Sequence, residues 1–373
     1  MQSVRNSGCL NRRMRVLLTT PYDLAVPGGV NRHASELLAA LSERGVEARL
    51  VGPASFPVHT DDPRIVRLGR VSAHGLNGAQ SRVTLDWSIR GAIRDLVRDF
   101  RPDVVHLQEP FLPLLNTLVL RAAGRARRIG TFHTYSETSR GYLWTWPWCR
   151  WIGAQLDARI AVSAAARDFA SHYHPGRYDV ISNGVRLPAE SMRRSSVPPH
   201  RPARLVFVGR AGEPRKGFEV LRRALEQLDR ETPGAFVLTV VGPDQPASDG
   251  LPIVWRGQLD DAALSEAYAA ADLALVPSLG GESFGLVALE ALAHGVPVVA
   301  SRIRGYAEWL EGRGMGELVS PGNPAVLAAA VRRLIGDRER HAQCGRRAME
   351  LAAEFSWEVV VERILRCYRG EAP

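Results

Sequence analysis

Cysteine is scarce in this chain, with four residues in 373. They stand far apart, without a C-x-x-C pair or the spacing of a metal site: Cys9, Cys149, Cys344 and Cys367. Reduced thiols in a cytoplasmic protein are the simplest interpretation. The sequence also lacks an apolar run of the roughly 20 residues that would cross a bilayer, and its first residues lack the apolar core of a signal peptide.

Acidic residues are outnumbered, with 39 Asp and Glu against 48 Lys and Arg and a formal net charge of +9. Such a balance favours anionic partners, among them nucleotide phosphates, anionic lipids and nucleic acids. An arginine-rich proteome explains the charge equally well, so charge alone selects no function. The remaining composition, 45% apolar and 23% charged, is that of an ordinary globular protein.

The two halves of the chain begin with the same order of elements. A predicted buried strand over 15–20 leads through a Pro/Gly loop into a helix that ends at Gly45. The second half begins ARLVFVGRAGEPRKGFEVL and repeats the order of strand, glycine-containing loop and helix. The length exceeds one ordinary core. Alternating strands and helices predict an α/β protein with two Rossmann-like domains that face each other across a cleft.

A segment rich in Pro, Ser and Arg separates the halves and has the composition of a linker. We expect five parts: a disordered extension (1–13), an N-terminal Rossmann-like domain (14–186), a linker (187–203), a C-terminal Rossmann-like domain (204–355) and a helix (356–373) that packs back on the N-terminal domain. Ligands of such sheets bind beyond the carboxyl ends of the strands. Motifs at strand ends in both halves should therefore meet one ligand.

The stretch SLGGESFGLVALEALAHGVPVV places two carboxylates near one predicted helix. Glu282 follows two glycines after a strand, and Glu290 would lie about 12 Å away if the segment were fully helical. A carboxylate pair that acts on one bond needs roughly 5–9.5 Å. The two acids therefore suit different hydroxyl-bearing parts of one long ligand, with phosphate at the backbone N–H groups between them. The alternative is a carboxylate that complements a helix dipole and another on a solvated face.

A second motif, GRAGEPRKG, gathers three cations after a strand of the second half. Arg210 and Arg215 offer guanidinium forks to phosphate, and Lys216 offers a point charge. The glycine spacing and the terminal Ser or Thr of a P-loop are missing. The motif suits a departing diphosphate; the alternative is a solvated basic turn.

Two motifs of the first half carry weaker signals. Gly28 and Gly29 precede a helix N-terminus that could face a phosphate or a sugar, but without G-x-G-x-x-G they indicate only a loop. His133 ends a strand in GTFHTYS and could hydrogen-bond a sugar. Taken alone, a histidine in this place is more often structural.

Together these motifs resemble the family 4 retaining glycosyltransferases of the GT-B fold, over nearly the whole chain from about Met14. ESFGLVALE is similar to the E-x7-E element of that family, GRAGEPRKG to its phosphate loop, and VPGGV and TFHT to its first-domain loops. More specifically, PYDLAVPGGVNRHASELL, HLQEPFLP and GQLDDA resemble the phosphatidylinositol α-mannosyltransferases of the family. The resemblance implies a hexosyltransferase that moves mannose from GDP-mannose to a lipid acceptor such as phosphatidylinositol.

The same resemblance implies roles for individual residues. Glu282 would hold the hydroxyls of the transferred sugar, and Glu290 the ribose of the nucleotide. The departing diphosphate would help take the acceptor proton, and no side-chain nucleophile is expected. The implied donor contacts are Gly29, Arg210, Arg215, Lys216, Leu259, Asp260, Asp261, Glu282, Ser283, Phe284, Gly285, Leu286 and Glu290. The residues implied at the reacting centre are Tyr22, His133, Arg210, Lys216 and Glu282.

The acceptor pocket that the resemblance implies is formed by Tyr22, Asn31, Leu76, Asn77, Arg82 and His133. Two of these positions depart from the family, which has a glutamine in place of Asn31 and a tyrosine in place of Leu76. Both changes fall in the acceptor pocket, so they bear on the acceptor and not on sugar transfer.

A predicted amphipathic helix that begins near Leu85 offers a membrane contact. Its basic residues are Arg90, Arg94, Arg98 and Arg101. A basic amphipathic helix can lie on anionic lipid, although an ordinary helix with a solvated face explains the pattern as well. A tryptophan cluster over 144–151 is a second membrane contact or part of the core, and Pro147 argues against a regular helix there.

The predicted partners are a nucleotide sugar, a lipid acceptor and an anionic membrane surface, with no nucleic acid and with peripheral association at the cytoplasmic face of the cell membrane. No metal-ligand cluster is visible, so we expect no required cofactor and activity that survives EDTA, with a stimulatory role for Mg²⁺ left open. Three alternatives remain: a UDP- or GDP-sugar transferase with another glycolipid, polysaccharide-precursor or soluble acceptor, a nucleic-acid-binding protein suggested by charge alone, and a sugar-nucleotide epimerase.

Overall fold

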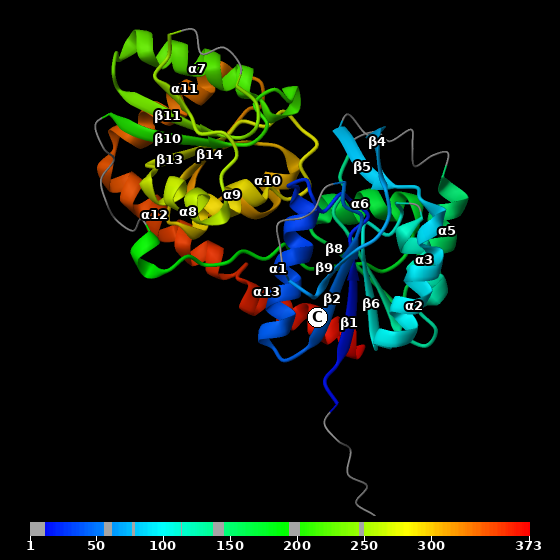
Figure 1. Cartoon of the computed structure of the whole chain (residues 1–373). Helices are drawn as coiled ribbons and strands as arrows, with labels where there is room; N and C mark the ends of the chain where they lie inside the picture. The colour runs from blue at the N-terminus through cyan, green and yellow to red at the C-terminus, as the bar shows by residue number, and fades with distance from the viewer. Residues whose placement is uncertain are drawn as a thin grey trace, which may run out of the picture.

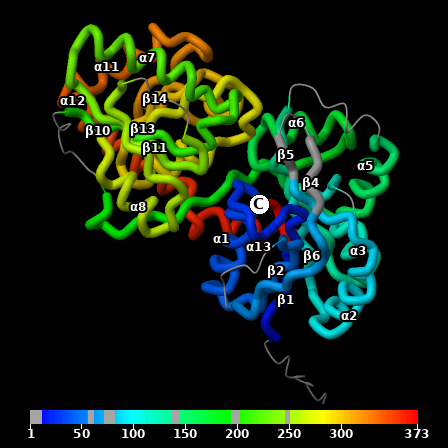
Figure 2. Tube along the Cα trace, turned by 45° about the horizontal axis from the view of Figure 1, so that its top comes forward, coloured from blue at the N-terminus to red at the C-terminus, as the bar shows by residue number. Residues whose placement is uncertain are grey.

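The computed structural model describes residues 12–55, 62–76, 79–112, 114–136, 145–193, 202–245 and 250–373, with backbone alone in 72–76 and 79–81. These residues form two lobes, each a parallel sheet between helices, and Figures 1 and 2 show the lobes side by side. The prediction of an α/β protein with two Rossmann-like domains is confirmed. Apart from Arg12 and Arg13, the extension predicted over 1–13 lies outside the described residues.

The N-terminal lobe is built on seven parallel strands in the order β3-β2-β1-β6-β7-β8-β9. The strands are β1 (Arg15–Thr19), β2 (Glu47–Gly52), β3 (Ile65–Arg67), β6 (Val104–Gln108), β7 (Arg127–Phe132), β8 (Ala158–Ala161) and β9 (Asp179–Val180). A separate antiparallel pair consists of β4 (Val71–Leu76) and β5 (Ala79–Thr84). The helical elements are α1 (Gly29–Glu43), the 3-10 turn η1 (Trp87–Ile89), α2 (Arg90–Phe100), α3 (Leu115–Ala122), α5 (Trp146–Gly153) and α6 (Ala164–Tyr173).

The C-terminal lobe is built on six parallel strands in the order β12-β11-β10-β13-β14-β15. The strands are β10 (Ala203–Val208), β11 (Phe236–Val241), β12 (Ile253–Trp255), β13 (Leu273–Val276), β14 (Val298–Ser301) and β15 (Gly316–Val319). The helical elements from the connecting segment onward are η2 (Glu190–Met192), η3 (Pro214–Lys216), α7 (Phe218–Glu231), α8 (Asp261–Ala270), α9 (Leu286–Ala293), α10 (Arg304–Leu310), α11 (Pro324–Gly336), α12 (Arg338–Ala353) and α13 (Trp357–Arg369). Figure 1 shows α7 and α11 on one side of this sheet and α8, α9 and α10 on the other.

The strands read as unbroken apolar runs because both faces of each sheet are buried. In β1, Val16 and Leu18 belong to the core under α1 and α13, whereas Leu17 belongs to the core under α2 and α3. All three side chains are fully buried. Burial of one such side chain stabilises the fold by about 1.5–3 kcal/mol, so the central strands anchor the loops that follow them.

The last helix returns to the N-terminal lobe, where Figure 1 shows it in red beside α1. The crossing is fixed by backbone hydrogen bonds, because Val185 N donates to Phe355 O at 2.8 Å and Trp357 N donates to Val185 O at 3.2 Å. The indole of Trp357 is buried and donates to Glu36 Oε2 of α1 at 2.6 Å. The chain therefore joins its lobes twice, through the segment that follows β9 and through the α12–α13 junction.

Each sheet reverses its strand order at one place, between β1 and β6 in the first lobe and between β10 and β13 in the second. Crevices form at such places because neighbouring connections leave toward opposite faces. The loops that follow β1, β10 and β13 carry three of the predicted motifs, and the motif with His133 follows β7, the neighbour of β6. The topology thus directs both sets of motifs to the carboxyl ends of the strands.

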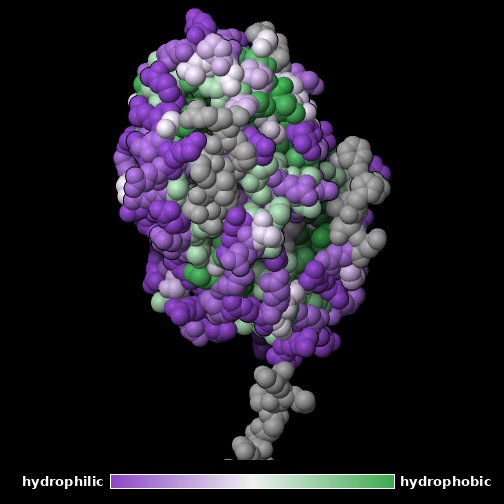
Figure 3. Space-filling model, turned by 90° about the vertical axis from the view of Figure 1, so that its left-hand side faces the viewer, coloured by the Kyte–Doolittle hydropathy of each residue, from purple (hydrophilic) through white to green (hydrophobic). Residues whose placement is uncertain are grey.

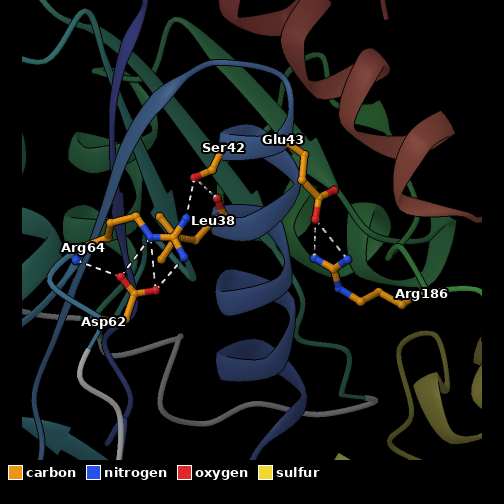
Figure 4. A network of polar contacts seen from close by, with 6 residues as sticks. All are labelled: Leu38, Ser42, Glu43, Asp62, Arg64 and Arg186. Atoms are coloured by element: carbon orange, nitrogen blue, oxygen red, sulfur yellow. Dashed lines mark hydrogen bonds and ion pairs between the residues drawn. The ribbon is translucent and has the colours of Figure 1, made fainter.

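Polar contacts hold the C-terminal half of α1 (Figure 4). Arg64 donates to Ser42 Oγ at 2.7 Å, and Ser42 donates to Leu38 O at 2.9 Å. On the opposite side, Glu43 pairs with Arg186 at 3.1 Å. The helix is therefore fixed from the sheet and from the segment that leads to the second lobe.

Helix α5 contradicts one sequence-based expectation. Pro147 was expected to oppose a regular helix, yet the helix begins at Trp146 and Pro147 lies in its first turn. Proline is tolerated there because the first-turn N–H groups have no intrahelical acceptor to lose. Cys149 and Ile152 are buried, while Trp146 and Trp151 remain 45% and 39% exposed. The cluster is therefore divided between core and surface.

Both lobes expose a few large apolar side chains, among them Val254 and Leu279 on the C-terminal lobe. Figure 3 shows the side that carries α7 and α12, which is covered mainly by hydrophilic residues. The N-terminal lobe exposes Leu85 and Trp87 next to α2, with 62% of Trp87 accessible. In the described part of the chain, no helix combines the length and the apolar character that a membrane span requires.

Candidate active site

A cavity of about 1440 Å³ lies between the lobes, at the carboxyl ends of the central strands of both sheets. It brings together most residues that the sequence singled out. The predicted residues in its wall are Tyr22, Gly29, Asn31, His133, Arg210, Arg215, Lys216, Leu259, Asp261, Glu282, Ser283, Phe284, Gly285, Leu286 and Glu290.

Four residues that were predicted to contact a ligand are not among the described residues that line the cavity. Asp260 caps α8 instead, because its carboxylate accepts from Ala263 N at 2.8 Å. Arg82 lies beside the cavity, with Nη1 3.8 Å from Asp23 Oδ2. Asn77 lies outside the described residues, as does the side chain of Leu76.

The loop from Pro277 to Gly285 forms the donor side of the cavity, between β13 and α9. The helix that the sequence predicted after the glycine-containing loop begins at Leu286. Gly285 adopts φ +94°, and a Cβ there would lie 2.2 Å from Tyr306 Cε1. Gly217 adopts φ +72°, and a Cβ there would lie 2.0 Å from Pro277 O. Only glycine fits both places, and the close approach brings the GRAGEPRKG loop against the acidic loop.

This approach creates a compact group of charges. Lys216 Nζ lies 2.6 Å from Glu282 Oε1, and Arg215 Nη1 lies 3.2 Å from the same oxygen. Arg210 and Arg215 both pair with Glu213. Three cations thus share two carboxylates, which leaves one positive charge for an anionic ligand at the end of β10.

Glu290 lies deeper than Glu282, with 7% of its surface exposed. Tyr268 donates its hydroxyl to Oε2 at 3.0 Å, and Arg32 Nε lies 3.2 Å from Oε1. Burial raises the pKa of Glu290, and the charge of Arg32 is the strongest opposing influence. Arg32 belongs to α1 of the other lobe, and sequence reasoning missed it although it directly follows Asn31 in the PGGVNRH motif.

The opposite wall, from the N-terminal lobe, presents His133 directly after β7. Its backbone N–H donates to Glu109 Oε1 at 2.6 Å, and its ring Nε2 lies 2.7 Å from Gln108 Oε1. The side chains of His133 and Gln108 therefore form one buried hydrogen bond. Burial lowers the pKa of His133 well below its usual value, and the rings of His33 and His106 add to the shift. His133 is therefore a neutral hydrogen-bonding group.

Glu109 supports this wall and was missed by the sequence analysis. It is 1% exposed and adopts φ +47°, a conformation that is uncommon outside glycine. Burial raises its pKa to about 7, against hydrogen bonds from His133 and Thr134. Burial also raises the pKa of Tyr22, and the charge of Glu109 adds to the shift, so Tyr22 keeps its proton. The sequence signal that could have identified Glu109 is its position between a predicted buried strand and Pro110.

Asn31 shapes the loop between β1 and α1. Its Nδ2 donates to Asp23 O at 2.8 Å and to Val26 O at 3.2 Å, and its Oδ1 accepts from Thr20 at 2.7 Å. Both amide hydrogens are thus bound within the loop. Asn31 lines the cavity, but in this structure it fixes the wall and offers no spare donor.

The cavity therefore has two chemically different sides. The C-terminal side offers cations, the first backbone N–H groups of α9 and two carboxylates, which suit a ligand with phosphates and hydroxyls. The N-terminal side offers the neutral groups of Tyr22 and His133 together with the charged pair of Arg32 and Glu36 on α1. In the ranges that the structure describes, no group of three His, Cys, Asp or Glu side chains is placed to hold a metal ion. Such an arrangement can hold an activated sugar against a second hydroxyl-bearing molecule.

The fold is shared with a solved nucleotide-binding protein. The HepE protein of Anabaena, solved in complex with UDP, matches with a TM-score of 0.73 at 18% sequence identity, over 96% of this chain and 100% of that one. Two parallel-sheet lobes with a cavity between their strand ends are the arrangement of the GT-B fold.

The sequence comparison is more specific. The family descriptions "Glycosyltransferase Family 4" and "Glycosyl transferases group 1" match residues 27–187 and 202–337. The phosphatidyl-myo-inositol mannosyltransferases of Mycobacterium leprae and Mycolicibacterium smegmatis are each 33% identical to this chain. The first match covers 96% of this chain and 97% of the relative, and the second covers 95% and 93%. The chain belongs to glycosyltransferase family 4.

Proposed function

We propose that the protein transfers mannose from GDP-mannose to phosphatidylinositol at the cytoplasmic face of the cell membrane, with retention of configuration. The observation that carries the proposal is the cavity in which Glu282, Arg215 and Lys216 of one lobe face His133 of the other. The likeness to two phosphatidyl-myo-inositol mannosyltransferases over nearly their whole length supports the choice of mannose and of phosphatidylinositol.

In this proposal the donor lies along the C-terminal wall. Arg210 and Lys216 bind the diphosphate, together with the N–H groups that begin α9. Glu282 accepts hydrogen bonds from the hydroxyls of the transferred sugar, and Glu290 accepts from the ribose. As the sugar leaves, negative charge grows on the diphosphate, so the cations stabilise the transition state more than the ground state.

The acceptor hydroxyl approaches from the wall of Tyr22 and His133. The bond between the anomeric carbon and the diphosphate breaks, the bond to the acceptor oxygen forms on the same face, and the acceptor proton passes to the departing diphosphate. The carboxylates in the described wall are Glu36, Asp261, Glu282 and Glu290. Each already pairs with a cation, which supports transfer without a carboxylate nucleophile.

Helix α2 supplies the proposed membrane contact, but through its charged face. Ile93, Val97 and Phe100 are buried in the lobe, so the apolar face of the helix is not available to lipid. Arg98 pairs with Asp95 and Asp99, at 2.7 and 3.0 Å. The remaining exposed cations of this segment are Arg90, Arg94 and Arg101.

Exposed tryptophans accompany these cations. Trp87 precedes α2, and on α5 Trp146 and Trp151 lie beneath Arg150 and Arg121. An aromatic ring next to a cation suits the headgroup region of a bilayer. Flotation with anionic and neutral vesicles tests the contact, since each arginine near an anionic surface contributes about 1 kcal/mol. Equal binding to both vesicle types would reject an electrostatic contact.

A second candidate keeps the fold but changes the ligands. The occupied amide of Asn31 and the apolar Leu76 both fall in the implied acceptor pocket. Both observations point to the second candidate, in which a UDP- or GDP-sugar is the donor and another glycolipid, a polysaccharide precursor or a soluble molecule is the acceptor.

The deciding experiment incubates the purified protein with phosphatidylinositol vesicles and labelled GDP-mannose or UDP-glucose. Mannose in the lipid phase, released by an α-mannosidase, would support donor, acceptor and retention together. Label released only by a β-mannosidase would reject retention. Donor hydrolysis without labelled lipid would reject this acceptor, and no turnover of either donor would reject the proposed function.

A further inference from the structure

Arg32 joins three carboxylates that come from three helices. Its Nε lies 3.1 Å from Glu36 Oε1 on α1 and 3.2 Å from Glu290 Oε1 on α9, and its Nη1 lies 3.5 Å from Asp261 Oδ1 on α8. Two of these helices belong to the opposite lobe. A residue of the acceptor lobe therefore contacts the deepest carboxylate of the donor wall.

The surroundings of Glu290 make this contact consequential. The groups that face it are Arg32 and Glu36 from α1, Asp261 and Tyr268 from α8, and His294 from its own helix. Two of them are carboxylates, and both add to the rise of the pKa of Glu290 that burial causes. Arg32 is the cation in direct contact with Glu290, so its loss would leave a buried carboxylate among other acids.

A fixed helix holds Arg32 in place. The C-terminal half of α1 is held by the contacts of Figure 4, and Glu36 accepts from Trp357 Nε1 at 2.6 Å. At the other end, a Cβ on Gly29 would lie 3.6 Å from Leu286 Cδ1, so α1 and α9 pack closely where both begin. The guanidinium thus reaches Glu290 from a rigid scaffold.

We propose that Arg32 is a positioning residue for the donor, which holds the Glu290 carboxylate charged and aimed at the nucleotide ribose from the opposite lobe. This inference rests on the donor site of the proposed function. Each carboxylate oxygen has two acceptor positions, so Glu290 can receive ribose hydroxyls while it keeps Arg32 and Tyr268. Nucleotide affinity then depends on a side chain of the acceptor lobe.

The test measures binding of GDP and of UDP by calorimetry between pH 6 and pH 9, in Arg32→Gln and Arg32→Lys. We expect Arg32→Gln to weaken GDP binding by about 10- to 100-fold at pH 6, as for a lost hydrogen bond to a charged group. Unaided Glu290 ionises only as the pH rises, so the deficit should shrink toward pH 9. Arg32→Lys should fall between wild type and Arg32→Gln.

A matched control separates positioning from lobe closure. Arg304 of α10 also pairs across the lobes, with Asp168 of α6. Its guanidinium lies over the ring of Tyr135 at the cavity wall, 5.8 Å from the centroid, and the contacts of Glu290 do not include it. Arg304→Gln should leave the pH profile of GDP binding unchanged. In kinetics, Arg32→Gln should raise the KM for the donor and keep kcat within about threefold of wild type.

Three results would overturn the inference. Wild-type GDP affinity in Arg32→Gln at every pH would remove Arg32 from the donor site. An equal, pH-independent deficit in Arg32→Gln and Arg304→Gln would show that Arg32 acts only by closing the lobes. Failure of the wild type to bind GDP or UDP would reject the proposed function itself, and the inference with it. If Arg32→Gln no longer unfolds cooperatively on heating, the GDP affinity of Arg32→Lys decides between these outcomes.

Discussion

The two walls of the cavity follow parallel sheets of the same kind but differ in the state of their titratable groups. The C-terminal wall holds ion pairs, whereas the groups around His133 on the N-terminal wall are buried and favour their neutral forms. On the C-terminal wall, Glu282 and Lys216 face each other as partners of opposite charge, and both remain in part accessible. On the N-terminal wall, His133 and Glu109 are buried, and their pKa values are displaced toward the neutral forms. One wall suits an anionic donor, and the other suits a neutral hydroxyl.

The difference arises from what covers each sheet. The cations of the C-terminal wall stand on loops that open into the cavity. The polar groups of the N-terminal wall lie above α13, where Tyr368 bonds His106 at 2.6 Å and Trp357 packs against His33. Removal from water disfavours charge, so burial under the returning helix favours the neutral forms of these histidines. The ends of the parallel strands determine where these side chains lie, whereas the burial of each side chain determines its charge state.

Substitution of Glu282 should have the largest effect. We expect Glu282→Ala to reduce transfer by about 10³-fold, because the sugar and Lys216 lose their carboxylate partner and Arg215 keeps only Glu213. The thermal unfolding midpoint should stay close to that of wild type, since the loop packs through its backbone. Initial rates and thermal unfolding check both points. A folded Glu282→Ala variant with full activity would contradict the role of this wall.

Lys216 should rank second. We expect Lys216→Ala to lower kcat by about 10²-fold and to change the KM for the donor less, because charge grows on the diphosphate in the transition state. Arg230→Gln, which changes the charge of α7 away from the cavity, is the matched control. Equal loss of kcat in both variants would mean that net charge matters rather than the position of Lys216.

The buried histidines predict acid sensitivity in the N-terminal lobe. Burial lowers the pKa of His33 to about 4 and that of His106 to about 3, from 6.5 in the unfolded chain. Between these values the unfolded chain binds more protons than the native one, so the free energy of unfolding falls as the pH drops below 6.5. The smaller shift corresponds to about 3 kcal/mol.

Hydrogen exchange at pH 7, 6, 5 and 4 can locate this effect. Peptides from β6 and α13 should lose protection at higher pH than peptides from β10 and α7. Loss of protection in both lobes at the same pH, or first in the C-terminal lobe, would contradict the comparison of the two walls.

Removal of divalent metal ions by EDTA should have the smallest effect on the transfer rate. The cations that face the donor are side chains, so we expect the transfer rate to be unchanged after EDTA treatment and dialysis. The assay of labelled lipid with and without EDTA checks this. Activity that EDTA abolishes and Mg²⁺ restores would show that the cations of the C-terminal wall do not suffice.

Local patterns in the sequence were enough for the scaffold. Buried parallel strands read as short apolar runs, and glycines mark the ends of helices, so β1, β13 and the start of α9 at Leu286 were predictable. The motifs at the strand ends were also readable, because glycines stand beside charged residues between a predicted strand and a predicted helix. Pro147 misled the prediction because the rule against proline does not apply to the first turn of a helix.

Tertiary contacts decided what the sequence could not show. Arg32 meets Glu290 because helices α1 and α9 of the two lobes pack together, and Glu109 meets His133 because the segments after β6 and β7 lie side by side. Charge state and partner choice depend on burial and on neighbours that are distant in the chain, and neither quantity has a local signature. The sequence by itself thus determined the strands, the helices and the chemistry available at their ends. The packing of two lobes and a returning helix determined which of those groups are charged, paired and aimed at a ligand.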